Sequence, residues 1–193
     1  MKTSNRSRNK LVVGLGGLAI VVLMAASPGV SGAAPSVGST VLSPSYAKSI
    51  GFTKTVQAAK KTKVTSQKNC TQSVEAVYED AAGKTGLVSE TLQCTSKAAA
   101  TKALAGARKQ VKVYSSVKVP KQLGPTAFVT ASDAPEYLIA WIAGSKVAIT
   151  AVDVDVASST STSTSSTVVP KPLTAAQVKT LTSAALKQNS LYH

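Results

Sequence analysis

The sequence has only one histidine in 193 residues, and this histidine, His193, is the last residue of the chain. Ser-His-Asp and Cys-His catalytic groups need a histidine that is held firmly beside the nucleophile. Neither group can be assembled convincingly around a histidine at the end of the chain. We therefore expect a protein that is not an enzyme.

Cysteine is almost as rare, because Cys70 and Cys94 are the only two. A structural zinc site needs about four cysteine or histidine ligands, so we expect no metal site and no cofactor. Asp153 and Asp155 could place two carboxylates on one face of a strand, as a metal site or an acid–base pair would need. Because calcium takes about six or more oxygen ligands, the solvated face of a strand is the favoured interpretation.

Aromatic residues make up only 4% of the chain, although 44% of its residues are hydrophobic. Alanine, valine, serine and threonine supply most of its bulk, so the core is expected to be modest. A composition that is rich in valine and threonine favours strands over a helical bundle.

Acidic residues are scarce, with 8 against 22 basic residues, and the excess is uneven. From Lys48 to Lys121 there are 14 basic and 4 acidic residues, whereas from Gln122 onward there are 4 of each. Lysines in the first of these regions are candidates for binding an anionic cell-wall polymer or a membrane surface. They lack interleaved aromatic residues, so no nucleic acid is expected, and a solvated surface is the alternative. The candidates are Lys54, Lys60, Lys61, Lys63 and Lys68.

The start of the chain has the layout of an export signal. Four basic residues between Lys2 and Lys10 precede the apolar run Leu11–Ala26, and small residues follow at Ser31–Ala34. This order predicts that residues 1–33 are a signal peptide and that the mature protein is secreted or associated with the cell wall. An uncleaved anchor is the alternative, but 16 apolar residues are short for a membrane span.

The rest of the chain divides by composition. Residues 34–41 are rich in small residues and are expected to be disordered. Residues 42–157 are predicted to form the folded domain. Ser158–Thr167 is an unbroken run of serine and threonine, so residues 158–172 are interpreted as a linker. Residues 173–193 are predicted to form an amphipathic helix.

The densest apolar stretch runs from Glu136 to Val156 and contains Trp141, the only tryptophan. Its two arms, Tyr137–Ala143 and Val147–Val156, flank the connection Gly144–Lys146. Strand-forming residues on both sides of a short turn that contains glycine predict a β-hairpin. We expect the core to be built around this hairpin.

A second hairpin is predicted from Val74–Tyr78 and Leu87–Leu92, with turn residues at Asp80–Lys84. If the turn is centred near Ala82, Cys70 and Cys94 lie directly opposite each other. An exported protein provides the oxidising environment that a disulfide needs. Cys70 and Cys94 are therefore predicted to form a disulfide that closes the open end of the hairpin.

Capping residues and apolar periodicity predict helices at Leu42–Gly51, at Thr95–Gln110 and from Thr174 onward. Val111–Val119 and Thr126–Thr130 are predicted strands. Phe52–Lys68 is interpreted either as a loop or as the site of an edge strand at Lys63–Lys68. This order predicts an α+β fold: a curved antiparallel sheet of about five or six strands, an Ala-rich helix packed on one face, and short N- and C-terminal helices.

The strand Tyr137–Ala143 is apolar on both faces, so each face needs a cover. One face is expected to meet the Thr95–Gln110 helix. The C-terminal helix, a protein partner or a ligand could cover the other. Tyr137 and Trp141 are candidate residues of such a ligand face, with a place in the core as the alternative.

Four short motifs resemble segments of small exported α+β modules of Gram-positive bacteria, which include extracellular sensor-type domains and uncharacterised secreted proteins. The motifs are Cys94-Thr95-Ser96, Leu123–Ala127, Trp141–Val147 and Leu173–Gln177. The resemblance implies a similar fold and location, and it brings no catalytic residues with it. The sensor domains usually carry more disulfides than two cysteines allow.

Three hypotheses about function follow. The first is a secreted, non-enzymatic binding module for a cell-envelope component or a partner protein. The second is a structural wall-associated protein that is held electrostatically to anionic polymers. The third is a small hydrolase that uses carboxylates of the disulfide hairpin, which carries Glu75, Glu79, Asp80 and Glu90.

Overall fold

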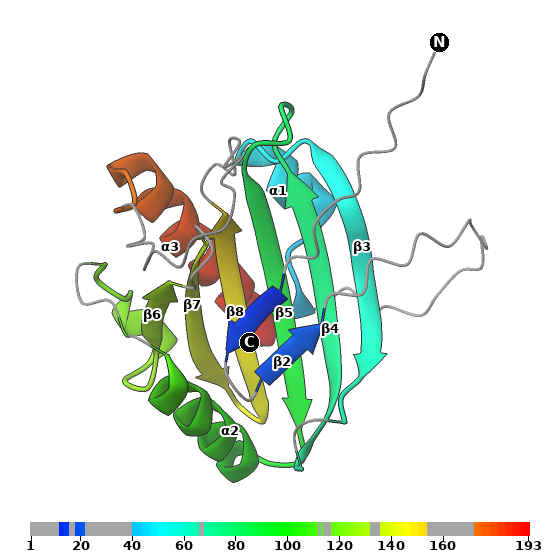
Figure 1. The fold of residues 1–193 in the computed structure, drawn as a ribbon, viewed down its shortest axis with the longest axis vertical. Coiled ribbons are helices and arrows are strands. Elements are labelled where there is room, and N and C mark those ends of the chain that lie inside the picture. The colour runs from blue at the N-terminus through cyan, green and yellow to red at the C-terminus, as the bar shows by residue number, and fades with distance from the viewer. Residues whose placement is uncertain are drawn as a thin grey trace, which may run out of the picture.

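The computed structural model describes residues 12–15, 18–21, 40–65, 68–111, 113, 117–131, 136–153 and 172–193. These residues form a six-stranded antiparallel sheet with helices, and a separate two-stranded sheet (Figure 1). The fold is therefore α+β, as predicted. The two-stranded sheet pairs β1 (Val12–Leu15) with β2 (Leu18–Val21), inside the predicted signal. The Ser158–Thr167 tract lies outside the described residues.

Both predicted hairpins are confirmed, as β4–β5 and β7–β8, and β5 pairs with β8 to join them. The turn between β7 and β8 contains Gly144, whose φ of 61° favours glycine. Strands β3 and β6 form the two edges of the sheet. The spatial order is β3 (Lys54–Lys63), β4 (Cys70–Glu79), β5 (Gly86–Cys94), β8 (Lys146–Asp153), β7 (Glu136–Ala143) and β6 (Phe128–Ala131).

The edge strand β3 lies earlier in the chain than predicted. It runs from Lys54 to Lys63, so both the loop and the strand at Lys63–Lys68 were wrong. Eight of its ten residues are exposed, and only Val56 and Gln57 are half-buried. A strand with no buried face has no apolar alternation, which is the signal that marks strands in a sequence.

Two further predictions fall partly outside the described residues. Within Val111–Val119, the described residues form one isolated bridge, from Val113 to Thr130. Val117, another described residue of this stretch, is buried in the core. Of residues 34–41, the structure describes only the last two, and Val41 is 1% exposed.

The predicted disulfide between Cys70 and Cys94 is confirmed. The two residues are direct partners in the β4–β5 register, and both side chains are buried. The turn at the other end of the hairpin is stabilised by Asp80, whose carboxylate accepts hydrogen bonds from the backbone N–H groups of Lys84 and Thr85. The Thr85 hydroxyl also donates to this carboxylate; this bond most, and the backbone bonds after it, lower the pKa of Asp80.

Replacing both cysteines by serine is expected to lower the free energy of unfolding by about 3 kcal/mol, since the disulfide closes a loop of roughly 25 residues in the unfolded chain. Urea unfolding with and without a reductant measures this effect. The reductant should lower the urea midpoint of the natural protein and leave the urea midpoint of the Cys70→Ser/Cys94→Ser variant unchanged. Equal midpoints for the two oxidised proteins would contradict the prediction.

The three predicted helices are present, and each begins at a side-chain cap. Ser43 caps α1 (Pro44–Ser49), and Ser96 caps α2 (Lys97–Gln110). Thr174 caps α3 (Ala175–Asn189) in a capping box with Gln177. Short 3-10 turns follow at η2 (Lys121–Leu123) and η3 (Ser190–Tyr192). Within the described part of the chain, no helix is long and apolar enough to cross a membrane.

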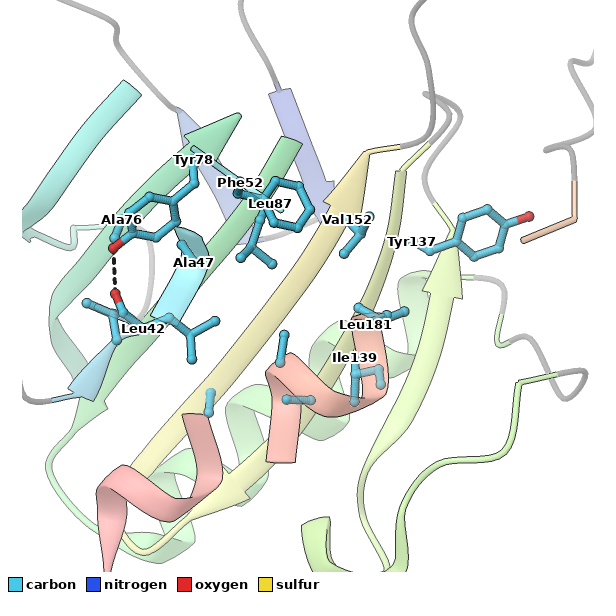
Figure 2. Close-up of a cluster of buried hydrophobic side chains, with 14 of the residues drawn as sticks. Leu42, Ala47, Phe52, Ala76, Tyr78, Leu87, Tyr137, Ile139, Val152 and Leu181 are labelled. Carbon is cyan, nitrogen blue, oxygen red and sulfur yellow. Dashed lines mark hydrogen bonds between the residues drawn. The ribbon is translucent and has the colours of Figure 1, made fainter. Parts of the chain in front are cut away.

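The large sheet has two covered faces, named here by their helices. On the α2 face, Leu138 and Ala140 of β7 share a buried cluster with Leu104 of α2. On the α3 face, Ile139 and Trp141 share a second cluster with residues of α3, α1 and the segment before α1. Figure 2 shows Leu181 of α3 close to Ile139, and Tyr78 donating a hydrogen bond to the carbonyl of Leu42.

Candidate functional site

The candidate ligand face at Tyr137 and Trp141 is part of the core. Trp141 is 0% exposed and Tyr137 is 2% exposed. The indole N–H of Trp141 donates to the side-chain Oδ1 of Asn189, at the end of α3, over 2.9 Å. Helix α3 therefore occupies this surface. Tyr137 and Trp141 do not form an open ligand face; they belong to the core, which was the alternative interpretation.

A buried polar network fastens α3 to the sheet. Gln188 of α3 is fully buried; its Oε1 accepts from the Thr150 hydroxyl at 2.7 Å, and its Nε2 donates to the carbonyl of Glu90 at 2.9 Å. The Tyr192 hydroxyl lies 2.6 Å from that of Thr91 and donates to the carbonyl of Thr40 at 3.0 Å. Sequence reasoning missed Gln188, although it lies seven residues after Leu181, on the same side of the helix.

The five candidate lysines lie along and just beyond the edge strand, and all five are exposed. Lys54 and Lys60 are paired in register with Glu79 and Glu75, so they lie on the α2 side of the edge. Lys61 and Lys63 lie opposite Val74 and Gln72, but Lys60 and Lys61 are consecutive and point to opposite sides. The structure therefore brings the lysines to one edge of the sheet but not to a single face.

Strand β3 is poorly suited to pairing with a further strand. Its register with β4 shifts between Thr55 and Gln57 and again between Gln57 and Lys60. Bulges and edge lysines both disfavour edge-to-edge pairing. A partner at this edge would therefore bind through the lysine side chains and not by strand addition.

Two carboxyl groups face each other on the α2 face. Glu75 and Glu90 are register partners on β4 and β5. The Ser73 hydroxyl donates to Glu90 Oε1 at 2.5 Å, and the Gln57 amide donates to Glu75 Oε1 at 2.9 Å. Burial raises the pKa of Glu90 to about 8, the Glu75 charge adds to the rise, and the bond from Ser73 opposes it. Burial also raises the pKa of Glu75, against the effects of Gln57 and Lys60.

The carboxylate-dependent hydrolase gains no support from this pair. Both carboxyls of such an enzyme must reach the substrate, but Glu90 is 3% exposed and Glu75 is 9% exposed. The arrangement is instead that of a buried acid which keeps its proton near neutral pH.

A further acid, Asp153 at the end of β8, is half-buried and not on a fully solvated face as predicted. Burial raises its pKa to about 6, and the charge of Glu79 adds to the rise. The Asp153 carboxylate lies over Gly86, where a Cβ atom would stand 3.1 Å from Oδ2. Asp155 lies outside the described residues. Among those described, no group of three or more His, Cys, Asp or Glu residues could hold a metal ion.

No protein-family model, no curated protein and no solved structure matches this chain.

Proposed function

We propose that the protein is a secreted, non-enzymatic binding module whose lysine-bearing edge strand holds it to an anionic polymer of the cell envelope. The observation that carries the proposal is the exposure of all four lysines of β3 on a strand that contains no acidic residue. Exposed charges of one sign attract a polymer of the opposite sign.

Three acidic residues lie near this strand, and only Glu79, the half-buried register partner of Lys54, is a direct counter-charge. Glu75 is almost buried beside Gln57, and Glu90 lies one strand further in. With a pKa of about 8, Glu90 is largely uncharged near pH 7. Lys60, Lys61 and Lys63 therefore face solvent with only weak internal compensation, whereas Lys54 has Glu79 opposite it.

A partner or ligand on the second face of the central hairpin is not proposed, because α3, the other candidate cover, packs on that face. Export is supported by the basic and apolar start of the chain and by the buried disulfide, which is stable in an oxidising compartment. The resemblance to exported Gram-positive modules agrees with this proposal and remains a prediction.

The test is salt-dependent retention on isolated, protein-stripped Gram-positive cell walls. The variant changes Lys54, Lys60, Lys61 and Lys63 to Gln, and it is expected to weaken binding at low salt at least about tenfold, since each lysine near an anionic surface contributes about 1 kcal/mol. High salt should release the natural protein, because exposed charges are screened.

A matched control changes four exposed lysines elsewhere, so that the net charge falls by the same amount. These are Lys118, Lys121, Lys179 and Lys187. Retention of this control should fall much less than that of the β3 variant. Equal losses in both variants would reduce the effect to net charge and contradict a site at β3.

A further inference from the structure

We infer that the binding surface continues beyond β3, around the disulfide-bonded end of the β4–β5 hairpin and onto the outer side of α2. The ligand that follows this path is a linear polyanion of several repeats. This surface, the basic band, comprises the lysines of β3, Lys68 and the basic side chains of α2. The inference rests on the proposed function and states the extent of the site and the shape of its ligand.

Three chain segments meet where the band turns. The N–H of Val64, just after β3, donates to the carbonyl of Thr71 at 2.9 Å. The N–H of Thr95, just before α2, donates to the carbonyl of Asn69 at 2.9 Å. The disulfide fixes the same end of the hairpin. The end of β3, the turn at Lys68 and the start of α2 are therefore held together by covalent and backbone bonds.

Helix α2 continues the charge from this point. Lys97, Lys102, Arg108 and Lys109 are exposed, and the helix contains no acidic residue. The opposite side of the helix is buried against the sheet through Ala100, Leu104 and Ala107. Figure 1 shows α2 leaving the lower end of β5, near the start of β4, and running away from β3. The band is thus extended and not a compact cluster.

The shape of the band favours a flexible chain over a flat surface or a small anion. Strand β3 spans roughly 33 Å at about 3.3 Å per residue, and α2 spans roughly 21 Å at about 1.5 Å per residue. The strand lies along the edge of the sheet, whereas the helix lies across one face. A flat membrane would contact one of these elements at a time, but a linear polymer can follow both.

The experiment compares binding of tripolyphosphate, long-chain linear polyphosphate and vesicles of phosphatidylglycerol to the full chain. An α2 variant changes Lys97, Lys102, Arg108 and Lys109 to Gln, which keeps helix propensity; it is tested beside the β3 variant and the control variant described above. Either variant alone should weaken long-chain polyphosphate binding at least about tenfold, whereas tripolyphosphate binding should be weak and change little.

The outcomes separate the two proposals. Loss of long-chain binding in the β3 variant with none in the α2 variant would overturn the band and leave the proposed function standing. Equal, small losses in the β3, α2 and control variants would overturn both. Vesicle binding as strong as that of long-chain polyphosphate, and equally sensitive to both variants, would overturn the linear ligand in favour of a membrane surface.

Discussion

A chain that ends at Thr167, and so lacks α3, is expected to lose its cooperative fold. The truncation uncovers Trp141 and Ile139 and removes Gln188 from beside the Thr150 hydroxyl. Each large apolar side chain that returns to water costs about 1.5–3 kcal/mol, and each buried polar group left without its partner costs about 1–3 kcal/mol. The sum is comparable with the roughly 5–15 kcal/mol by which a domain is stable.

Trp141 reports the result directly, because it is the only tryptophan. Its fluorescence emission should shift to the red in the truncated chain, and a synthetic peptide of residues 172–193 should reverse the shift. Gln188→Ala is a milder version that should cost about 1–3 kcal/mol. The neighbouring Lys187→Ala changes an exposed residue and is the matched control. A truncated chain with unchanged emission and an unchanged urea midpoint would show that α3 is dispensable.

The features predicted correctly from the sequence are those with local causes. Ser43, Ser96 and Thr174 cap helices because a side-chain oxygen satisfies N–H groups only two or three residues away. The disulfide followed from counting residues on either side of a turn, since antiparallel partners are symmetric about it. Both kinds of inference need only a few neighbouring residues.

The features that were missed or left open depend on contacts between distant segments. The residues near Trp141 do not indicate which element covers it. Its hydrogen-bond partner Asn189, at the end of α3, lies 48 residues later in the chain. Gln188 appears polar in the sequence, and only the sheet supplies partners that make it suitable for burial. Strand β3 was displaced in the prediction because its pairing with β4, and not its own pattern, makes it a strand.

Glu90→Gln is expected to raise the free energy of unfolding by roughly 4 kcal/mol at pH 8 and to change it little at pH 4. In the unfolded chain this carboxyl has an ordinary pKa of 4.5, and in the folded protein its pKa is about 8. Each pH unit between two such values corresponds to about 1.4 kcal/mol. The folded protein therefore binds more protons between pH 4.5 and 8, and its stability falls as the pH rises through this window.

The measurement is urea unfolding of the natural protein and the variant at several pH values from 4 to 9. The natural protein should be most stable on the acidic side of this range, and Asp153 acts in the same direction between its ordinary pKa of 3.8 and about 6. Glu79→Gln, at the half-buried end of the same hairpin, is the control, and its effect should be limited to relieving the charge that helps to raise the pKa of Asp153. Parallel stability curves for the Glu90→Gln variant and the natural protein would contradict the prediction.

The Glu90→Gln substitution also tests how the charge of Glu90 affects binding to cell walls. Glutamine in place of Glu90 keeps an oxygen that can accept from Ser73 and stays neutral at every pH. In the natural protein, ionisation of Glu90 above pH 8 adds a negative charge on β5, two strands in from β3. Retention on cell walls should therefore weaken above pH 8 in the natural protein and remain more nearly constant in Glu90→Gln, because the lysines of the basic band then face no new opposing charge.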